Sequence, residues 1–168
     1  EIDALVAPIA LYPDDLLSQI FMASTYPLEV VQANRWATQN QNLKGDALGE
    51  GLEKQDWDPS VKSLVNFPEV LSKMSDKLDW TQKLGDAFLE QQKDVMDAVQ
   101  RLRAKAQAAG NLQTTEQQKV IVEEKVIKME PARPHFVYVP TYNPTVVYGA
   151  WPYPAYPPYA YYPPGYVA

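Results

Sequence analysis

The chain has 168 residues, of which 46% are hydrophobic, and a formal net charge of −6. This length suits one domain with an appendage, and the apolar fraction is large enough for a core. The negative charge argues against nucleic acids and anionic membrane surfaces as partners, because both are bound by basic faces. The absence of cysteine excludes disulfides, thiol catalysis and cysteine-ligated metals.

Two further features bear on the compartment. No run of 18 apolar residues occurs, so we expect no transmembrane helix. The chain starts at Glu1 without a methionine. That start is expected of an exported protein after removal of a signal peptide, although a trimmed chain would look the same.

The charges are unevenly distributed. All 21 acidic residues lie at or before Glu130, and the last basic residue is Arg133. Nine of the 11 tyrosines and ten of the 15 prolines lie from Pro131 onward. The sequence therefore predicts a charged helical part followed by an uncharged part rich in proline and tyrosine.

Two Tyr-Pro steps organise the start of the chain, at Tyr12-Pro13 and Tyr26-Pro27. A residue before proline avoids the helical region, and proline itself is tolerated at a first helical position, so each step should end one helix and open the next. Before the first step, residues 2–11 form a short apolar segment with helical character. Between the steps, a stripe at helical spacing predicts a buried central helix. Its residues are Leu16, Leu17, Ile20, Phe21 and Ser24.

Proline and capping signals mark the helices that follow. Asp58 before Pro59 is a typical helix start, with the aspartate as N-cap and the proline at the first helical position. Gly110 is a natural helix stop. We expect helices to begin at Pro27, Asp46, Pro59 and Pro68, followed by the longest helix over residues 79–109.

After residue 111 the pattern changes to that of strands. β-Branched residues predict strands at 120–122 and 126–127, with residues 123–125 as the tip of a hairpin. Residues 136–139 and 145–148 read as two more strands joined by a proline-containing turn. Together these segments predict a small antiparallel meander.

Residues 149–168 hold six prolines, six tyrosines and one tryptophan, and favour polyproline II. We call this segment the arm. The expected fold class is therefore α+β, mainly α. It comprises a helical domain over residues 1–110, a small antiparallel β region over 111–148, and the arm.

Several motifs spread over nearly the whole chain belong together. They are Leu5-Val-Ala-Pro-Ile-Ala-Leu-Tyr-Pro-Asp14, Ala23-Ser-Thr-Tyr-Pro-Leu-Glu-Val-Val31, Arg35-Trp36, Trp57-Asp-Pro-Ser-Val61, Leu78-Asp-Trp-Thr-Gln-Lys-Leu-Gly-Asp-Ala-Phe88, Phe136-Val-Tyr-Val-Pro140 and Asn143-Pro144. In these motifs the chain resembles the bacterial exported proteins classed as domain of unknown function 3300. The resemblance implies an exported protein of a Gram-negative-type cell envelope, made with a signal peptide, and carries over no catalytic residue. Members usually show a glycine-containing hairpin tip, where this chain has Glu124-Lys125.

The residues themselves point to no catalytic centre, metal site or cofactor. His135 is the only histidine, and its Pro-His-Phe context is typical of a strand edge. No His/Cys cluster for zinc and no glycine-rich phosphate loop is present. Paired carboxylates could serve a hydrolase, but helix capping and solubility explain them more simply. These pairs are Asp14/Asp15, Asp56/Asp58 and Asp94/Asp97.

Arginine beside tryptophan, at Arg35-Trp36, is expected to form a buried ion pair or a cation–π contact, with a structural role.

The arm is the best candidate for function, because tyrosine and tryptophan offer large amphipathic contact area and polyproline II is already extended. The candidate partner-binding residues are Trp151, Tyr153, Tyr156, Tyr159, Tyr161, Tyr162 and Tyr166. We expect a non-enzymatic envelope protein with a structural or assembly role, whose arm binds a protein partner or a second copy. The arm could also be a disordered linker. One alternative function is a carbohydrate- or peptidoglycan-binding module using Trp57, Trp80 and Trp151, and another is a hydrolase using a carboxylate pair.

Overall fold

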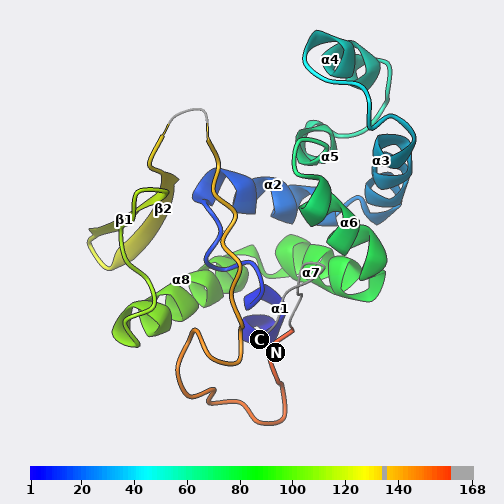
Figure 1. The fold of residues 1–168 in the computed structure, drawn as a ribbon. Coiled ribbons are helices and arrows are strands. Elements are labelled where there is room, and N and C mark those ends of the chain that lie inside the picture. Colours follow the sequence, from blue (N-terminus) through cyan, green and yellow to red (C-terminus); the bar gives the residue numbers. More distant parts are fainter. Residues whose placement is uncertain (134–135, 160–168) are drawn as a thin grey trace. The chain divides into compact units, whose positions relative to one another are not determined.

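The computed structural model describes residues 1–133 and 136–159, and helices dominate it (Figure 1). By spatial contacts the chain forms two compact units. Unit 1 combines Glu1–Ser18 with Glu90–Ala168, and unit 2 is Gln19–Leu89. The predicted segments 1–110, 111–148 and 149–168 follow composition, whereas unit 1 joins the two ends of the sequence. None of the helices in the described part of the chain is long and apolar enough to cross a membrane.

The expected class, mainly α with a small antiparallel sheet, is confirmed. The helices are α1 (Ile2–Val6), α2 (Asp14–Ser24), α3 (Pro27–Gln39), α4 (Asp46–Glu53), α5 (Pro59–Leu64), α6 (Pro68–Asp76), α7 (Leu78–Glu90) and α8 (Gln92–Ala108). The strands are β1 (Gln118–Glu123) and β2 (Val126–Pro131).

Unit 2 follows the local signals closely. Pro27, Pro59 and Pro68 each occupy the first turn of a helix, as predicted. Asp58 caps α5, since its carboxylate accepts a hydrogen bond from the N–H of Ser60 at 3.0 Å. Within this unit, α3 packs against α5 and α6.

Apolar packing fills the core of unit 2. Ile20 is fully buried, and the rings of Phe21 and Phe88 stack with centroids 5.3 Å apart. Gly85 of α7 lies against the end of α2, where a Cβ atom would come within 2.2 Å of the carbonyl oxygen of Ser24. Only glycine permits this approach.

The prediction of one long helix over residues 79–109 is wrong, because two helices, α7 and α8, occupy this range. Gln91 has φ −138° and ψ 49°, which separates α7 from α8. The exposed Gln91 also interrupts the apolar stripe. The predicted stop is confirmed, since α8 ends at Ala108 and Gly110 follows with a left-handed φ of 78°.

In unit 1, α1 packs against α8, and β2 lies beside α8 (Figure 1). The predicted hairpin is confirmed, with Glu123 paired to Val126 at its tip. Glu124 and Lys125 both have left-handed φ values, of 46° and 72°. Such a two-residue turn matches the twist of the strands, although it usually recruits asparagine or glycine.

The two further strands predicted at 136–139 and 145–148 are wrong. Phe136 makes only an isolated bridge with Arg133, and residues 137–143 have no regular structure. Residues 144–148 form turns. The prolines in this stretch lack an N–H donor, which interrupts any ladder. The sheet in the described residues is therefore a single hairpin rather than a meander.

Candidate functional site

The described part of the arm, residues 149–159, begins at Gly149, whose φ is 74°. The indole N–H of Trp151 donates to the carbonyl oxygen of Tyr156 at 2.9 Å and so closes a loop. The ring of Trp151 packs against Tyr148, with centroids 6.2 Å apart, and meets Tyr153 edge-on at 6.0 Å. The described part of the arm thus makes its own aromatic cluster.

Further contacts hold the described part of the arm to the rest of unit 1. The ammonium of Lys105, on α8, lies over the rings of Trp151 and Tyr153, at 5.7 and 5.3 Å from their centroids. The N–H of Tyr159 donates to the carbonyl oxygen of Ala4 in α1 at 3.2 Å. The described part of the arm, orange to red in Figure 1, therefore returns to α1 of its own chain.

The candidate partner-binding residues thus fall into three groups. Trp151 and Tyr159 are half-buried anchors. Tyr153 and Tyr156 keep 39% and 49% of their surface exposed. Tyr161, Tyr162 and Tyr166 lie outside the described residues, as does His135.

Just before the arm in the sequence, two tyrosines contact the first turn after α1. The hydroxyls of Tyr142 and Tyr148 both donate to the carbonyl oxygen of Ala7, the former at 2.9 Å. The N–H of Leu11 donates to the Tyr142 hydroxyl at 3.4 Å. Burial raises the pKa of both phenols well above the usual value. They are therefore neutral donors with a structural role.

Arg103, which the sequence analysis did not select, is the buried polar centre of unit 1. Its guanidinium donates to the carbonyl oxygens of Ala10, Tyr12 and Ile127 at 2.8–2.9 Å. It also pairs with the Asp14 carboxylate at 2.7 Å. One side chain thus joins α8, the corner before α2 and β2.

A sequence signal for Arg103 does exist. It lies four residues after Val99 and three before Ala106, within the buried stripe of α8. An arginine at such a position must be paired, because an unpaired buried charge is costly.

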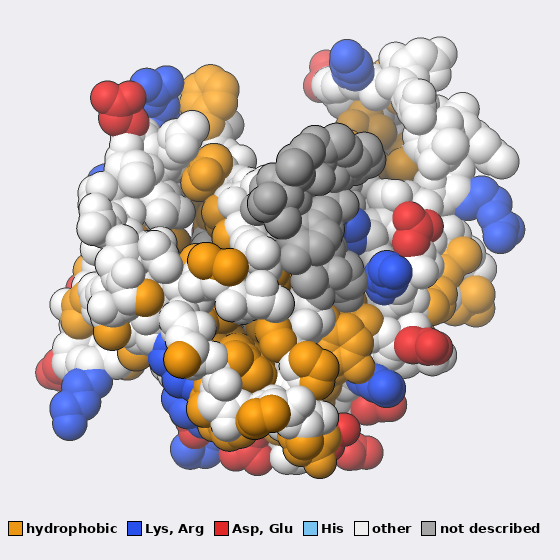
Figure 2. Space-filling model, turned by 60° about the horizontal axis from the view of Figure 1, so that its bottom comes forward, with side chains coloured by type: hydrophobic (Ala, Val, Ile, Leu, Met, Phe, Trp, Pro, Cys, Tyr) orange, Lys and Arg blue, Asp and Glu red, His pale blue; other side chains and the backbone are white. Residues whose placement is uncertain are grey.

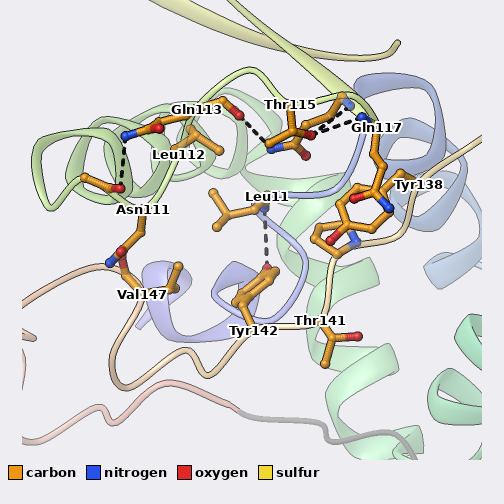
Figure 3. A pocket seen from close by; sticks show the side chains of 13 residues that line it. Leu11, Asn111, Leu112, Gln113, Thr115, Gln117, Tyr138, Thr141, Tyr142 and Val147 are labelled. Carbon is orange, nitrogen blue, oxygen red and sulfur yellow. Dashed lines mark hydrogen bonds between the residues drawn. The ribbon is translucent and has the colours of Figure 1, made fainter. Parts of the chain in front are cut away.

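A pocket of about 310 Å³ in unit 1 is lined by Leu11 and Tyr142, among other residues (Figure 3). Figure 3 shows Tyr142 facing Leu11, and Asn111 beside Val147, to whose carbonyl oxygen the Asn111 amide donates at 3.0 Å. No lining side chain is charged. The amide oxygen of Gln118 is buried without a partner among the described residues. Most of the other polar groups of the lining form hydrogen bonds with one another, as expected of a pocket with a structural role.

The three tryptophans expected to bind glycans are not alike. Trp80 is buried in unit 2, with 3% of its surface exposed. Trp151 is held inside the arm's cluster in unit 1. Trp57 is half-buried and meets Trp36 edge-on, with ring centroids 6.0 Å apart and an angle of 78°. A pocket of about 530 Å³ in unit 2 is lined by both of these rings.

The predicted buried ion pair at Arg35 is wrong. Arg35 is exposed, lines the same pocket as Trp36, and has no ion-pair partner in the part of the chain that the structure describes.

Each carboxylate pair considered for hydrolysis contains a residue with a structural task. Asp14 pairs with Arg103, Asp58 caps α5, and Asp97 pairs with Lys93 at 2.7 Å. Within residues 1–133 and 136–159, no three His, Cys, Asp or Glu side chains gather as a metal site would require.

Comparison with known proteins identifies the family of the chain. The family model described as "Protein of unknown function (DUF3300)" matches residues 1–168. The chain is also 47% identical, over 196 aligned residues, to "Uncharacterized protein YacH" of Escherichia coli (strain K12). That alignment covers 98% of this chain and 32% of the relative, so the chain spans about a third of the relative's length. No solved structure matches the chain. From the match over its whole length, the chain belongs to the DUF3300 family.

Proposed function

We propose that this chain is a non-enzymatic, exported protein of the bacterial cell envelope, and that it attaches to a protein partner through the arm. The observation that carries the proposal is the arm's geometry. Trp151 and Tyr159 anchor it to unit 1, while Tyr153 and Tyr156 keep much of their ring surface exposed. Resemblance to exported envelope proteins supports the location.

An anchored arm suits binding better than a flexible linker would. A partner that docks on ordered residues does not have to offset the entropy of ordering them. Tyrosine and tryptophan are also enriched among the residues that dominate binding energy at protein interfaces. The arm carries no charge, so little desolvation of ions opposes contact.

The described part of unit 1 also exposes apolar side chains outside the arm. Unit 1 exposes Phe136, Val137 and Val146 in addition to the two tyrosines. Figure 2, which brings the arm's side of unit 1 forward, shows hydrophobic side chains gathered in the lower part of the view. The partner surface that fits is therefore an uncharged, apolar one, on a second copy of this chain or on another envelope protein.

The test replaces the two exposed rings; Tyr153 gives up its contact with Lys105, while Trp151 and Tyr159 remain as anchors. In cells, the double variant Tyr153→Ser/Tyr156→Ser should lose its envelope partner in crosslinking, while its circular dichroism stays that of the parent. Leu89→Ser, which changes an exposed side chain in unit 2, is the matched control and should keep the partner. Unchanged crosslinking in the double variant would refute the proposal, and so would a protein that fractionates with the cytoplasm.

Light scattering on the purified chain identifies the kind of partner. If the partner is a second copy, deletion of residues 149–168 or the double variant should lower the mass of the particles. If the mass is that of one chain in both cases, the partner is a different protein.

A further inference from the structure

We infer that unit 2 carries a saccharide-binding site, formed by the pocket around Trp36 and Trp57. This site lies in unit 2 and the arm lies in unit 1, so the inference is independent of the function proposed above. Its volume of about 530 Å³ falls in the range of small-molecule sites.

The two indoles supply the apolar wall. Trp36 comes from α3, and Trp57 from the segment before α5. Their rings meet edge-on, at 78°. An edge-on pair covers less of its two faces than a stacked pair does, so ring surface is left for a ligand. The C–H face of a pyranose is a broad apolar surface of the kind that packs on an aromatic ring.

Contacts within unit 2 hold the backbone of Trp36 and border its indole ring. The side-chain amide of Asn40 donates to the Trp36 carbonyl oxygen at 2.8 Å. Gly51 of α4 leaves room for the ring, since a Cβ atom there would come within 2.9 Å of it. A larger residue at this position would displace the indole.

The position of Trp57 is fixed as well. The next residue, Asp58, donates its N–H to the Glu29 carboxylate at 2.6 Å and caps α5 with its side chain. The backbone on that side of the indole is therefore held both to α3 and to α5. Binding at such a preorganised wall costs little entropy.

The rim supplies hydrogen bonds without a dominant charge. Gln32, Gln39 and Gln55 line the pocket, and their side-chain amides make no hydrogen bond with the residues that the structure describes. An amide offers both donors and acceptors, and so does each sugar hydroxyl. Arg35 adds one guanidinium, and Asp56 and Glu29 add two carboxylates, of which Glu29 already accepts from the N–H of Asp58.

Other ligand classes fit this set less well. Glu29 and Asp56 oppose an anion, and Arg35 opposes a cation. A hydrocarbon would bury the amides of the rim without partners, which is costly. An uncharged ligand with an apolar face and many hydroxyls satisfies all of these groups. A proline-rich peptide would also pack on the indoles, and the experiment separates it from a sugar.

The experiment is calorimetric titration of the full chain with two probes, an oligomer of N-acetylglucosamine and an oligomer of glucose. We expect saturable binding of at least one of them. Comparison of the two affinities shows whether the site recognises the acetamido group. Trp57→Ala should weaken binding at least about tenfold through loss of the stacking contact. Leu28→Ala, which changes an exposed side chain of α3 outside the pocket lining, is the matched control and should bind like the parent.

A second variant guards against misfolding. Gln32→Ala/Gln39→Ala changes two exposed side chains of α3, should leave circular dichroism unchanged and should weaken binding at least about tenfold, since two hydrogen bonds are lost. The inference fails if neither oligosaccharide binds at millimolar concentration, or if the folded variants bind as the parent does. It also fails if a peptide with the sequence of residues 149–168 binds this pocket and the sugars do not.

Discussion

The two units are held together by different means. In unit 1, hydrogen bonds join residues far apart in the sequence, with 89 positions between Asp14 and Arg103 and 135 between Ala7 and Tyr142. In unit 2, apolar contacts between helices dominate, as between α3 and α6 and between Phe21 and Phe88, and the hydrogen bond between Glu29 and Asp58 spans 29 positions. Unit 1 thus depends on a few buried polar side chains, and unit 2 on apolar packing between its helices.

The largest loss of stability is expected from a change at Arg103 in unit 1. Arg103→Met should lower the free energy of unfolding by about 3–5 kcal/mol, because three buried carbonyl oxygens lose their donor. Urea unfolding followed by circular dichroism measures the loss. Lys93→Met, also on α8 but in an exposed pair, should leave the midpoint nearly unchanged. Equal midpoints for both variants would show that the polar centre does not hold unit 1.

In unit 2 the corresponding change is apolar. Ile20→Ala should cost about 2–5 kcal/mol, because the side chain is fully buried and truncation leaves a cavity. Met22→Ala, on an exposed position of the same helix, is the control. Thermal unfolding of Ile20→Ala that matches the parent would contradict the burial of α2.

A smaller effect sharpens the role of close helix packing in unit 2. Gly85→Ala should destabilise by about 1–3 kcal/mol, because its Cβ would collide with the Ser24 carbonyl oxygen. Gly49→Ala in α4 meets nothing within 4 Å and should instead stabilise by about 0.5–1 kcal/mol, as alanine is the better helix former. Opposite shifts of the melting temperature are expected, and shifts of the same sign would refute the packing argument.

The smallest effect at neutral pH concerns the tyrosines of unit 1. Burial raises the pKa of Tyr142 and Tyr148, so the folded state holds their protons above about pH 10, where the unfolded chain releases them. Their contribution to stability is therefore complete below about pH 10 and is lost as the pH rises further. Tyr148→Phe should cost about 1 kcal/mol at neutral pH for the lost hydrogen bond.

Urea unfolding at neutral and at alkaline pH tests this sign. The loss of stability on going to alkaline pH should be smaller in Tyr148→Phe than in the parent, because one group that titrates differently in the two states is gone. Tyr153→Phe, which changes an exposed ring, is the control. An alkaline loss of the same size in Tyr148→Phe would contradict the account.

The features that the sequence predicts are those with local causes. Helix starts at Pro27, Pro59 and Pro68, the cap at Asp58 and the hairpin between β1 and β2 all depend on residues within a few positions. The burial of α2 also follows from its own periodicity.

The features that escaped prediction depend on distant residues or on competing signals. Arg103 meets its acceptors only after α1 and β2 have been brought to α8. Residues 145–148 have strand-like composition, but Tyr148 is drawn to Ala7 instead of to a neighbouring strand. The pairing of Trp36 with Trp57 likewise needs α3 and the segment before α5 to meet, so the sequence indicated Trp57 as a binding residue but not its companion.

The division of unit 1 between both ends of the sequence has a consequence for the order of folding. The apolar residues 4–11 are made before α8 and Tyr148, which cover them. Unit 2 is complete once Leu89 has been made, so it can fold while that segment still waits. Contacts of such long range form slowly. During synthesis the segment is therefore an exposed apolar stretch, open to chaperones, and a chain that stops near Leu89 never covers it.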